Sequence, residues 1–107
     1  MKSISVNKNN YLKIEANIKE KIDKTISILK GYGAKDIYLF GSILKNRFSV
    51  YSDVDIAVSG LPEERYFEIM AKITDVLKRP VDLIDLDEKT IFTEYLKNDS
   101  EELYRVG

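Results

Sequence analysis

The sequence predicts an α+β fold in which a small mixed β-sheet has helices packed on one side. Three short β-rich runs predict strands at residues 36–40, 53–58 and 81–86. Longer stretches with apolar residues every three or four positions predict helices before, between and after these strands. A length of 107 residues with 44% hydrophobic residues suits one domain with a small core. We therefore expect residues 1–107 to form a single domain, with residues 1–10 as a flexible arm.

The first predicted helix runs from about Tyr11 to Lys30. Gly31 and Gly33 stand where it should end, because glycine readily takes the left-handed conformation that closes many helices. The apolar stripe of this helix consists of Ile14, Ile18, Ile22, Ile26 and Leu29.

The first strand ends at Gly41-Ser42, and residues 43–52 are expected to form a loop or a short helix. After the second strand, a turn at residues 59–62 leads into a helix that runs to about Lys78. The expected buried positions of this helix are Tyr66, Phe67, Ile69, Met70, Ile73, Val76 and Leu77.

The third strand leads into a last predicted helix at about residues 88–98, with Asp87 as its N-cap. Residues 100–106 are expected to form a short tail that is partly helical. The apolar positions that this last helix should bury are Ile91, Phe92, Tyr95 and Leu96.

The composition excludes several kinds of chemistry. The chain has no Cys and no His, so disulfides, thiol nucleophiles, His-ligated zinc and a Ser-His-Asp triad are all impossible. A net charge of -1 argues against non-specific electrostatic binding to nucleic acid. No apolar run is long enough to span a membrane or to form a signal peptide, so we expect a cytoplasmic protein without a membrane or direct nucleic-acid partner.

Two carboxylates project together from the second predicted strand. Asp53, Asp55 and Ala57 share one face of that strand, because side chains alternate along it. The two carboxylates then lie about 6–7 Å apart and repel one another. A divalent cation offsets this repulsion, and Mg²⁺ prefers carboxylate oxygens completed by substrate phosphates. An isolated Asp-x-Asp pair is, however, more often a pair of solvated acids.

The third predicted strand offers one more carboxylate to this site. If it lies beside the second strand, either Asp82 or Asp85 could complete a site of three carboxylates. Alternation alone does not choose between them, and we favour Asp82.

Gly41-Ser42 follows the first strand directly and forms a candidate phosphate-binding turn. Without a side chain at Gly41, a phosphate can approach the backbone N–H groups, and Ser42 adds a hydroxyl donor. Most Gly-Ser pairs are ordinary turns, so the weight of this one comes from its position relative to the acidic pair.

The sequence contains Gly41-Ser42, then ten further residues, then Asp53-x-Asp55. This arrangement resembles the G-S-x10-D-x-D pattern of the polymerase-β-like nucleotidyltransferases. Within this family, the chain looks like the minimal nucleotidyltransferases (MNT), which are encoded beside HEPN-domain partners. The features that it shares with them are its short length, Ser52 before Asp53 and the later VDLIDL run. The resemblance covers roughly residues 12–105 of this sequence.

The resemblance implies the roles of the site residues. It places the nucleotide triphosphate at Gly41 and Ser42 and two Mg²⁺ ions at Asp53 and Asp55. Asp82 would complete the metal site and help to deprotonate the incoming hydroxyl. The expected nucleotide-binding set is Gly41, Ser42, Lys45 and Ser52, and the expected catalytic and metal-binding set is Asp53, Asp55 and Asp82.

The chain departs from its apparent relatives near the phosphates. Ile43 and Asn46 stand where many of them have Arg and Gly, and Lys45 replaces a frequent Arg. The loss of one cation bears on nucleotide affinity but leaves the three acids in place.

The resemblance implies an antitoxin that transfers AMP from ATP to a tyrosine of a HEPN ribonuclease toxin encoded by the adjacent gene. Two alternatives stay open. One is a catalytically weak interaction protein that neutralises the HEPN partner by binding, and the other is a nucleotidyltransferase that acts on a small molecule.

Overall fold

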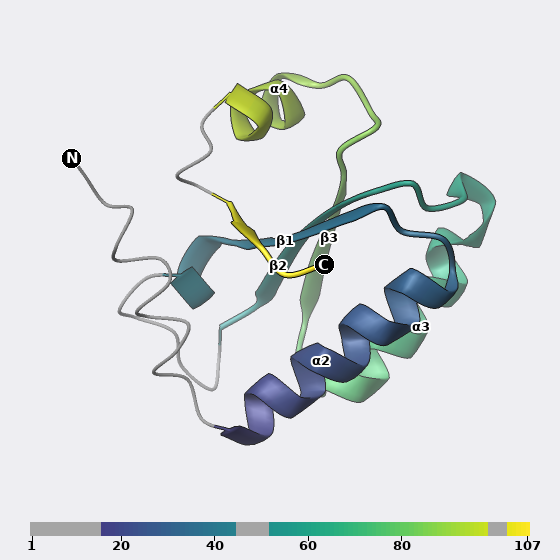
Figure 1. The fold of residues 1–107 in the computed structure, drawn as a ribbon, viewed down its shortest axis with the longest axis vertical. Helices are drawn as coiled ribbons and strands as arrows, with labels where there is room; N and C mark the ends of the chain where they lie inside the picture. Colours follow the sequence, from purple (N-terminus) through teal and green to yellow (C-terminus); the bar gives the residue numbers. More distant parts are fainter. Residues whose placement is uncertain (1–15, 45–51, 99–102) are drawn as a thin grey trace.

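Figure 1 shows the computed structural model of the chain, which describes residues 16–44, 52–98 and 103–107. The predicted arm at residues 1–10 lies outside these ranges, as do Lys45 and Asn46.

Three helices and four strands make up the described fold, together with two short 3₁₀ turns. Their order is α2 (Ala16–Gly31), β1 (Asp36–Phe40), η1 (Gly41–Leu44), β2 (Val54–Ser59), η2 (Glu63–Arg65), α3 (Tyr66–Leu77), β3 (Val81–Asp85), α4 (Ile91–Asn98) and β4 (Tyr104–Arg105). The predicted α+β class and the three predicted strands are confirmed.

The sheet is mixed and has the strand order β3-β2-β1-β4. β1 pairs with β2 and with β4 in antiparallel fashion, whereas β2 and β3 run parallel. Parallel neighbours need a crossover, which η2 and α3 supply here. As a result, β2 and β3 start at the same edge of the sheet.

Helices α2 and α3 pack side by side and cover one face of the sheet (Figure 1). Helix α4 lies on the opposite face, where Phe92 packs against Phe40 with ring centroids 5.9 Å apart, so the expectation that the helices pack on one side of the sheet holds for α2 and α3 but not for α4. The core between the sheet and the α2–α3 layer contains the buried side chains of Ile22, Leu29, Ile37, Leu39, Val54, Ile56, Val58, Ile69, Ile73 and Leu77.

One residue of the predicted buried face of α3 is not buried. Phe67 is 93% exposed, whereas Ile69 and Ile73 are fully buried and Tyr66 is partly buried. Helical periodicity could not place Phe67, because Tyr66 and Phe67 are adjacent and an α-helix turns about 100° between neighbours. Only one of the two can face the sheet.

The prediction for α4 was wrong in two respects. The helix begins at Ile91, and its N-terminal N–H groups are capped by Thr90, whose hydroxyl oxygen accepts a hydrogen bond from the Thr93 amide at 3.0 Å. Asp87 cannot serve as the cap, because its carboxylate accepts the Gly60 amide instead, at 2.8 Å. Of the residues that this helix was predicted to bury, only Leu96 is buried: its buried face consists of Thr93 and Leu96, and Ile91, Phe92 and Tyr95 are 92%, 43% and 50% exposed.

Among the described C-terminal residues 103–107, Tyr104 and Arg105 form the strand β4, which was not predicted, while residues 100–102 of the expected tail lie outside the described ranges. Tyr104 and Arg105 pair with Leu39 and Tyr38 of β1, and the Arg105 guanidinium forms an ion pair with Asp36 at 2.8 Å. This pairing covers the edge of β1 that β2 does not occupy. A two-residue strand carries no periodicity by which the sequence could have revealed it.

Ile69 and Phe67 give a matched test of this packing. We expect Ile69→Ala to lower the free energy of unfolding by about 2–5 kcal/mol, because it leaves a void in the core. Phe67→Ala should change it by less than about 0.5 kcal/mol, because that side chain is in solvent. Urea unfolding followed by circular dichroism measures both, and similar losses in the two variants would contradict the orientation of α3.

Candidate active site

Asp55 and Asp82 are direct neighbours in the sheet. The parallel register of β2 and β3 places Asp82 opposite Asp55 and Asp85 opposite Val58. Because side chains alternate between the faces of a strand, Asp82 shares the face of Asp55, whereas Asp85 shares the face of the buried Val58. The fold therefore brings Asp82 beside Asp55 and turns Asp85 away.

Gly41 leaves the space that the Asp55 carboxylate occupies. Phe40, the last residue of β1, pairs with Asp55, so Gly41 is the first residue past that pair. A methyl group at Gly41 would overlap Oδ2 of Asp55 and lie 3.0 Å from its Cγ. Gly41 also has a φ of 77°, in the left-handed region that favours glycine. The sequence predicted a phosphate-binding turn at this glycine, and the structure shows in addition its close contact with the Asp55 carboxylate.

The turn after Gly41 is anchored in the core. Ser42 is half-buried, and the next two residues of η1, Ile43 and Leu44, are buried. Ile43 is 0% exposed, which explains why an apolar residue stands where a cation was expected. The anchoring fixes Gly41 and Ser42 beside Asp55.

The surroundings of Asp55 raise the pKa of its carboxyl from 3.8 to about 6. Burial is the largest cause, followed by the negative charges of Asp82 and Asp53. None of the ion pairs among the described residues involves these three acids. The described part of the chain thus concentrates negative charge at the start of β2 and β3.

The segment that carries Asp53 is held from both sides by the linker between α3 and β3. The Arg79 Nη1 donates a hydrogen bond to the Ser52 carbonyl at 3.2 Å, and the Val54 amide donates to the Pro80 carbonyl at 3.1 Å. Asp53 lies between these two contacts and is exposed. Sequence reasoning missed this role of Arg79, and no local signal could have revealed a contact between residues 27 positions apart.

The carboxylates offer the donor chemistry of a divalent cation but not a complete coordination shell. Within the described ranges, no three acidic side chains converge closely enough to hold a metal ion by themselves. Mg²⁺ usually takes one or two carboxylates and fills its shell with water and substrate phosphates. Asp55 and Asp82 fit such a partial set, and a bound cation would offset the repulsion that raises the pKa of Asp55.

Comparison with known proteins identifies the family. Residues 23–106 match the family described as polymerase beta, nucleotidyltransferase. A Methanocaldococcus jannaschii protein, named as an inferred protein adenylyltransferase, is 35% identical over 97 residues, which cover 85% of this chain and 95% of that protein. No described helix has the length and apolar character needed to cross a membrane.

Several solved structures share the fold. A toxin–antitoxin crystal structure with AMP-PNP has a TM-score of 0.64 at 27% identity, over 81% of this chain and 70% of that chain. The Shewanella oneidensis complex of a tri-AMPylated HEPN toxin with its MNT antitoxin gives 0.60 at 27% identity, over 82% and 70%. The MntA–HepT toxin–antitoxin structure gives 0.60 at 25% identity, over 81% and 69%.

The family match spans most of the chain and agrees with the resemblance inferred from Gly41-Ser42 and Asp53-x-Asp55. The sheet topology places those two segments side by side, as the pattern requires. This chain is a member of the polymerase-β-like nucleotidyltransferase family, with the fold of the MNT antitoxins.

Proposed function

We propose that this protein is an antitoxin that transfers AMP from ATP to a tyrosine of a HEPN toxin. The observation that carries the proposal is that Asp55 and Asp82 lie next to each other and that Asp55 contacts Gly41, in a chain of the nucleotidyltransferase family. The M. jannaschii relative is named for protein adenylyl transfer, and the S. oneidensis complex contains an AMPylated toxin. The AMP-PNP in a further neighbour supports a nucleotide triphosphate as the substrate.

In this proposal the triphosphate lies along η1. Gly41 offers a backbone without a side chain, and Ser42 offers its hydroxyl as a donor to a phosphate oxygen. The buried Ile43 and Leu44 keep both residues in place. We further propose Lys45 and Ser52 as nucleotide-binding residues; Lys45 lies outside the described ranges.

Asp53, Asp55 and Asp82 are the proposed holders of two Mg²⁺ ions. When bound, such ions would neutralise the charge of the triphosphate and activate the acceptor hydroxyl. The chain contributes the placement of the three carboxylates: the sheet register fixes Asp55 and Asp82, and the contacts on either side of Asp53 fix its backbone.

The transfer itself exchanges one phosphorus–oxygen bond for another. The tyrosine oxygen of the toxin forms a bond to the α-phosphorus, and the bond from that phosphorus to the bridging oxygen of the β-phosphate breaks. Pyrophosphate leaves with the electron pair of the broken bond. Asp82, which is exposed beside Asp55, accepts the phenolic proton. Chemistry of this type depends on positioning and charge neutralisation and needs no histidine.

The transfer is tested by incubating the protein with ATP, Mg²⁺ and the HEPN protein of the adjacent gene, and measuring the toxin by mass spectrometry. We expect the toxin to gain one or more AMP groups on tyrosine. Asp53→Asn, Asp55→Asn and Asp82→Asn should each slow the gain by at least about 100-fold, because each removes a charge from the metal-binding set. Asp75→Asn, an exposed acid of α3, is the control and should keep the parent rate. Tight complex formation without any gain of mass would instead establish neutralisation by binding.

Gly41→Ala tests the contact between Gly41 and Asp55. We expect transfer to be lost and the free energy of unfolding to fall by about 1–3 kcal/mol, because the methyl group displaces the carboxylate and strains a left-handed backbone. Gly31→Ala is the matched control, since nothing lies within 4 Å of the added methyl group and its φ is not positive.

A double-mutant cycle attributes the Gly41→Ala loss to its cause. In an Asp55→Ala background the stability cost of Gly41→Ala should shrink toward the backbone component alone. An undiminished cost in that background would show that the methyl group meets no obstacle at Asp55.

The raised pKa of Asp55 predicts how stability depends on pH without divalent cations. Between pH 3.8 and about 6, folded Asp55 keeps a proton that the unfolded chain has released, so this residue makes stability fall as pH rises. Asp55→Asn should remove that contribution and be more stable than the parent at neutral pH by about 1–2 kcal/mol, after allowance for partial exposure. Urea unfolding in EDTA across this range measures the difference between the two proteins. A parent–variant difference that does not change with pH would contradict the prediction.

A further inference from the structure

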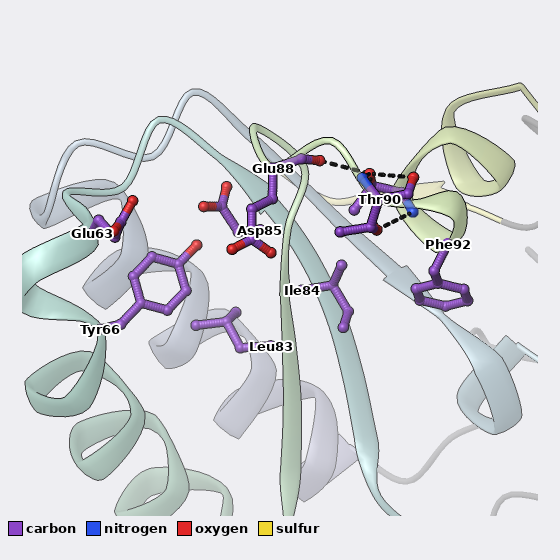
Figure 2. A pocket seen from close by; sticks show the side chains of 9 residues that line it. Glu63, Tyr66, Leu83, Ile84, Asp85, Glu88, Thr90 and Phe92 are labelled. Atoms are coloured by element: carbon purple, nitrogen blue, oxygen red, sulfur yellow. Dashed lines mark hydrogen bonds between the residues drawn. The ribbon is translucent and has the colours of Figure 1, made fainter.

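A pocket of about 310 Å³ lies at the far end of β3, between the start of α3 and the start of α4 (Figure 2). Its described lining consists of Glu63, Tyr66, Leu83, Ile84, Asp85, Glu88, Thr90, Phe92 and Thr93. None of the nucleotidyltransfer residues belongs to this set. Asp85 is three residues past Asp82, about 10 Å further along the strand.

The pocket carries uncompensated negative charge. Glu63, Asp85 and Glu88 line it, and no lysine or arginine is among its described lining residues. The ion pairs of the described residues leave all three acids out. Figure 2 shows the carboxylates of Asp85 and Glu88 close to the Tyr66 hydroxyl, with Glu63 on the opposite side of that hydroxyl.

The Tyr66 hydroxyl at this place has no hydrogen-bond partner among the described residues. Its oxygen is shielded from solvent and makes no hydrogen bond within the described part of the chain. Burial raises the pKa of Tyr66, and the charges of Asp85, Asp87, Glu88 and Glu63 raise it further. The Tyr66 hydroxyl can donate or accept a hydrogen bond, whereas the carboxylates of the pocket only accept, so a positively charged donor of hydrogen bonds complements all of these groups.

The remaining walls are apolar and aromatic. Leu83 and Ile84 lie on either side of β3, and the rings of Tyr66 and Phe92 stand at opposite ends of the pocket (Figure 2). Such walls accept a flat, weakly hydrated cation on an aliphatic stem better than a compact, strongly hydrated one. A guanidinium group fits this description, because it is planar, stacks on aromatic rings and has five N–H donors for several carboxylates.

We propose that this pocket is a binding site for an arginine side chain of a protein partner. A protein is favoured over a small free cation because the pocket continues into an apolar surface on α4. Ile91 is almost fully exposed, Phe92 is 43% exposed and Tyr95 is 50% exposed, although all three are large apolar or aromatic residues. The partner segment therefore carries the arginine next to apolar residues that cover this face.

The proposed site is separate from nucleotidyl transfer. It sits at the opposite end of the parallel strand pair from Asp55 and Asp82, and it requires neither ATP nor Mg²⁺. The inference therefore stands or falls independently of the AMP-transfer proposal, and a binding measurement without nucleotide tests it alone.

The test uses the full chain, labelled with ¹⁵N, and a capped Leu-Arg-Leu peptide as the probe. We expect saturable shifts of the amides of residues 83–93, around the pocket. The same peptide with citrulline in place of arginine keeps the shape and loses the charge, so it should bind at least about fivefold more weakly. Agmatine, a free guanidinium compound, should also bind more weakly, because it cannot cover the apolar face of α4.

Variants locate the interaction. Glu63→Gln with Glu88→Gln should weaken peptide binding at least about fivefold, because the two carboxylates face the guanidinium. Glu64→Gln with Glu20→Gln is the matched control: it removes the same two charges from exposed residues outside the described lining. Chemical-shift maps of the free variants show whether each keeps the parent fold.

Three results would overturn the proposal. Equal binding of the arginine and citrulline peptides would show that the positive charge of arginine does not contribute to binding. Unchanged binding in the folded Glu63→Gln, Glu88→Gln variant would place the peptide elsewhere. Agmatine binding as tight as that of the peptide would assign the pocket to a small cation and not to a protein partner.

Discussion

The half-buried carboxylate of Asp55 is the constraint around which this protein is built. It occupies the space that a side chain at position 41 would fill, and burial, followed by the charges of two further acids, raises its pKa. Such a group opposes folding at neutral pH, so stability must come from elsewhere. The compensation lies on the opposite face of the sheet, where Val54, Ile56 and Val58 pack beneath α2 and α3.

Alternation along β2 thus divides the sheet into a face that stabilises and a face that reacts. The parallel crossover through α3 serves both, because it buries Ile69 and Ile73 and returns the chain so that Asp82 meets Asp55. The linker at the end of α3 reaches back to the residues on either side of Asp53. A shift of α3 would therefore disturb the geometry of the acidic cluster as well as the core.

The strand β3 connects two places with related electrostatics. Both its start and its end carry carboxylates without a described positive partner, Asp82 at one end and Asp85 at the other. At the start of the strand, beside Asp82, the proposed nucleotidyl transfer requires a metal ion and a triphosphate. At the second place, the apolar walls and the exposed apolar side chains of α4 favour an arginine side chain of a protein partner. An enzyme that modifies a protein needs surface to hold it, and a site remote from the reacting atoms can supply affinity without obstructing them.

The sequence by itself determined the fold class, the three main strands and the family, because alternation and the Gly41-Ser42 to Asp53-x-Asp55 spacing are local patterns. It could not decide whether Asp82 or Asp85 lies beside Asp55, or whether Phe67 is buried. Nor could it show that the Asp87 carboxylate accepts a hydrogen bond from the Gly60 amide and does not cap a helix. Each of these depends on which residue a distant segment sets opposite it. Register, crossover and burial are long-range properties, and only the tertiary structure decided them.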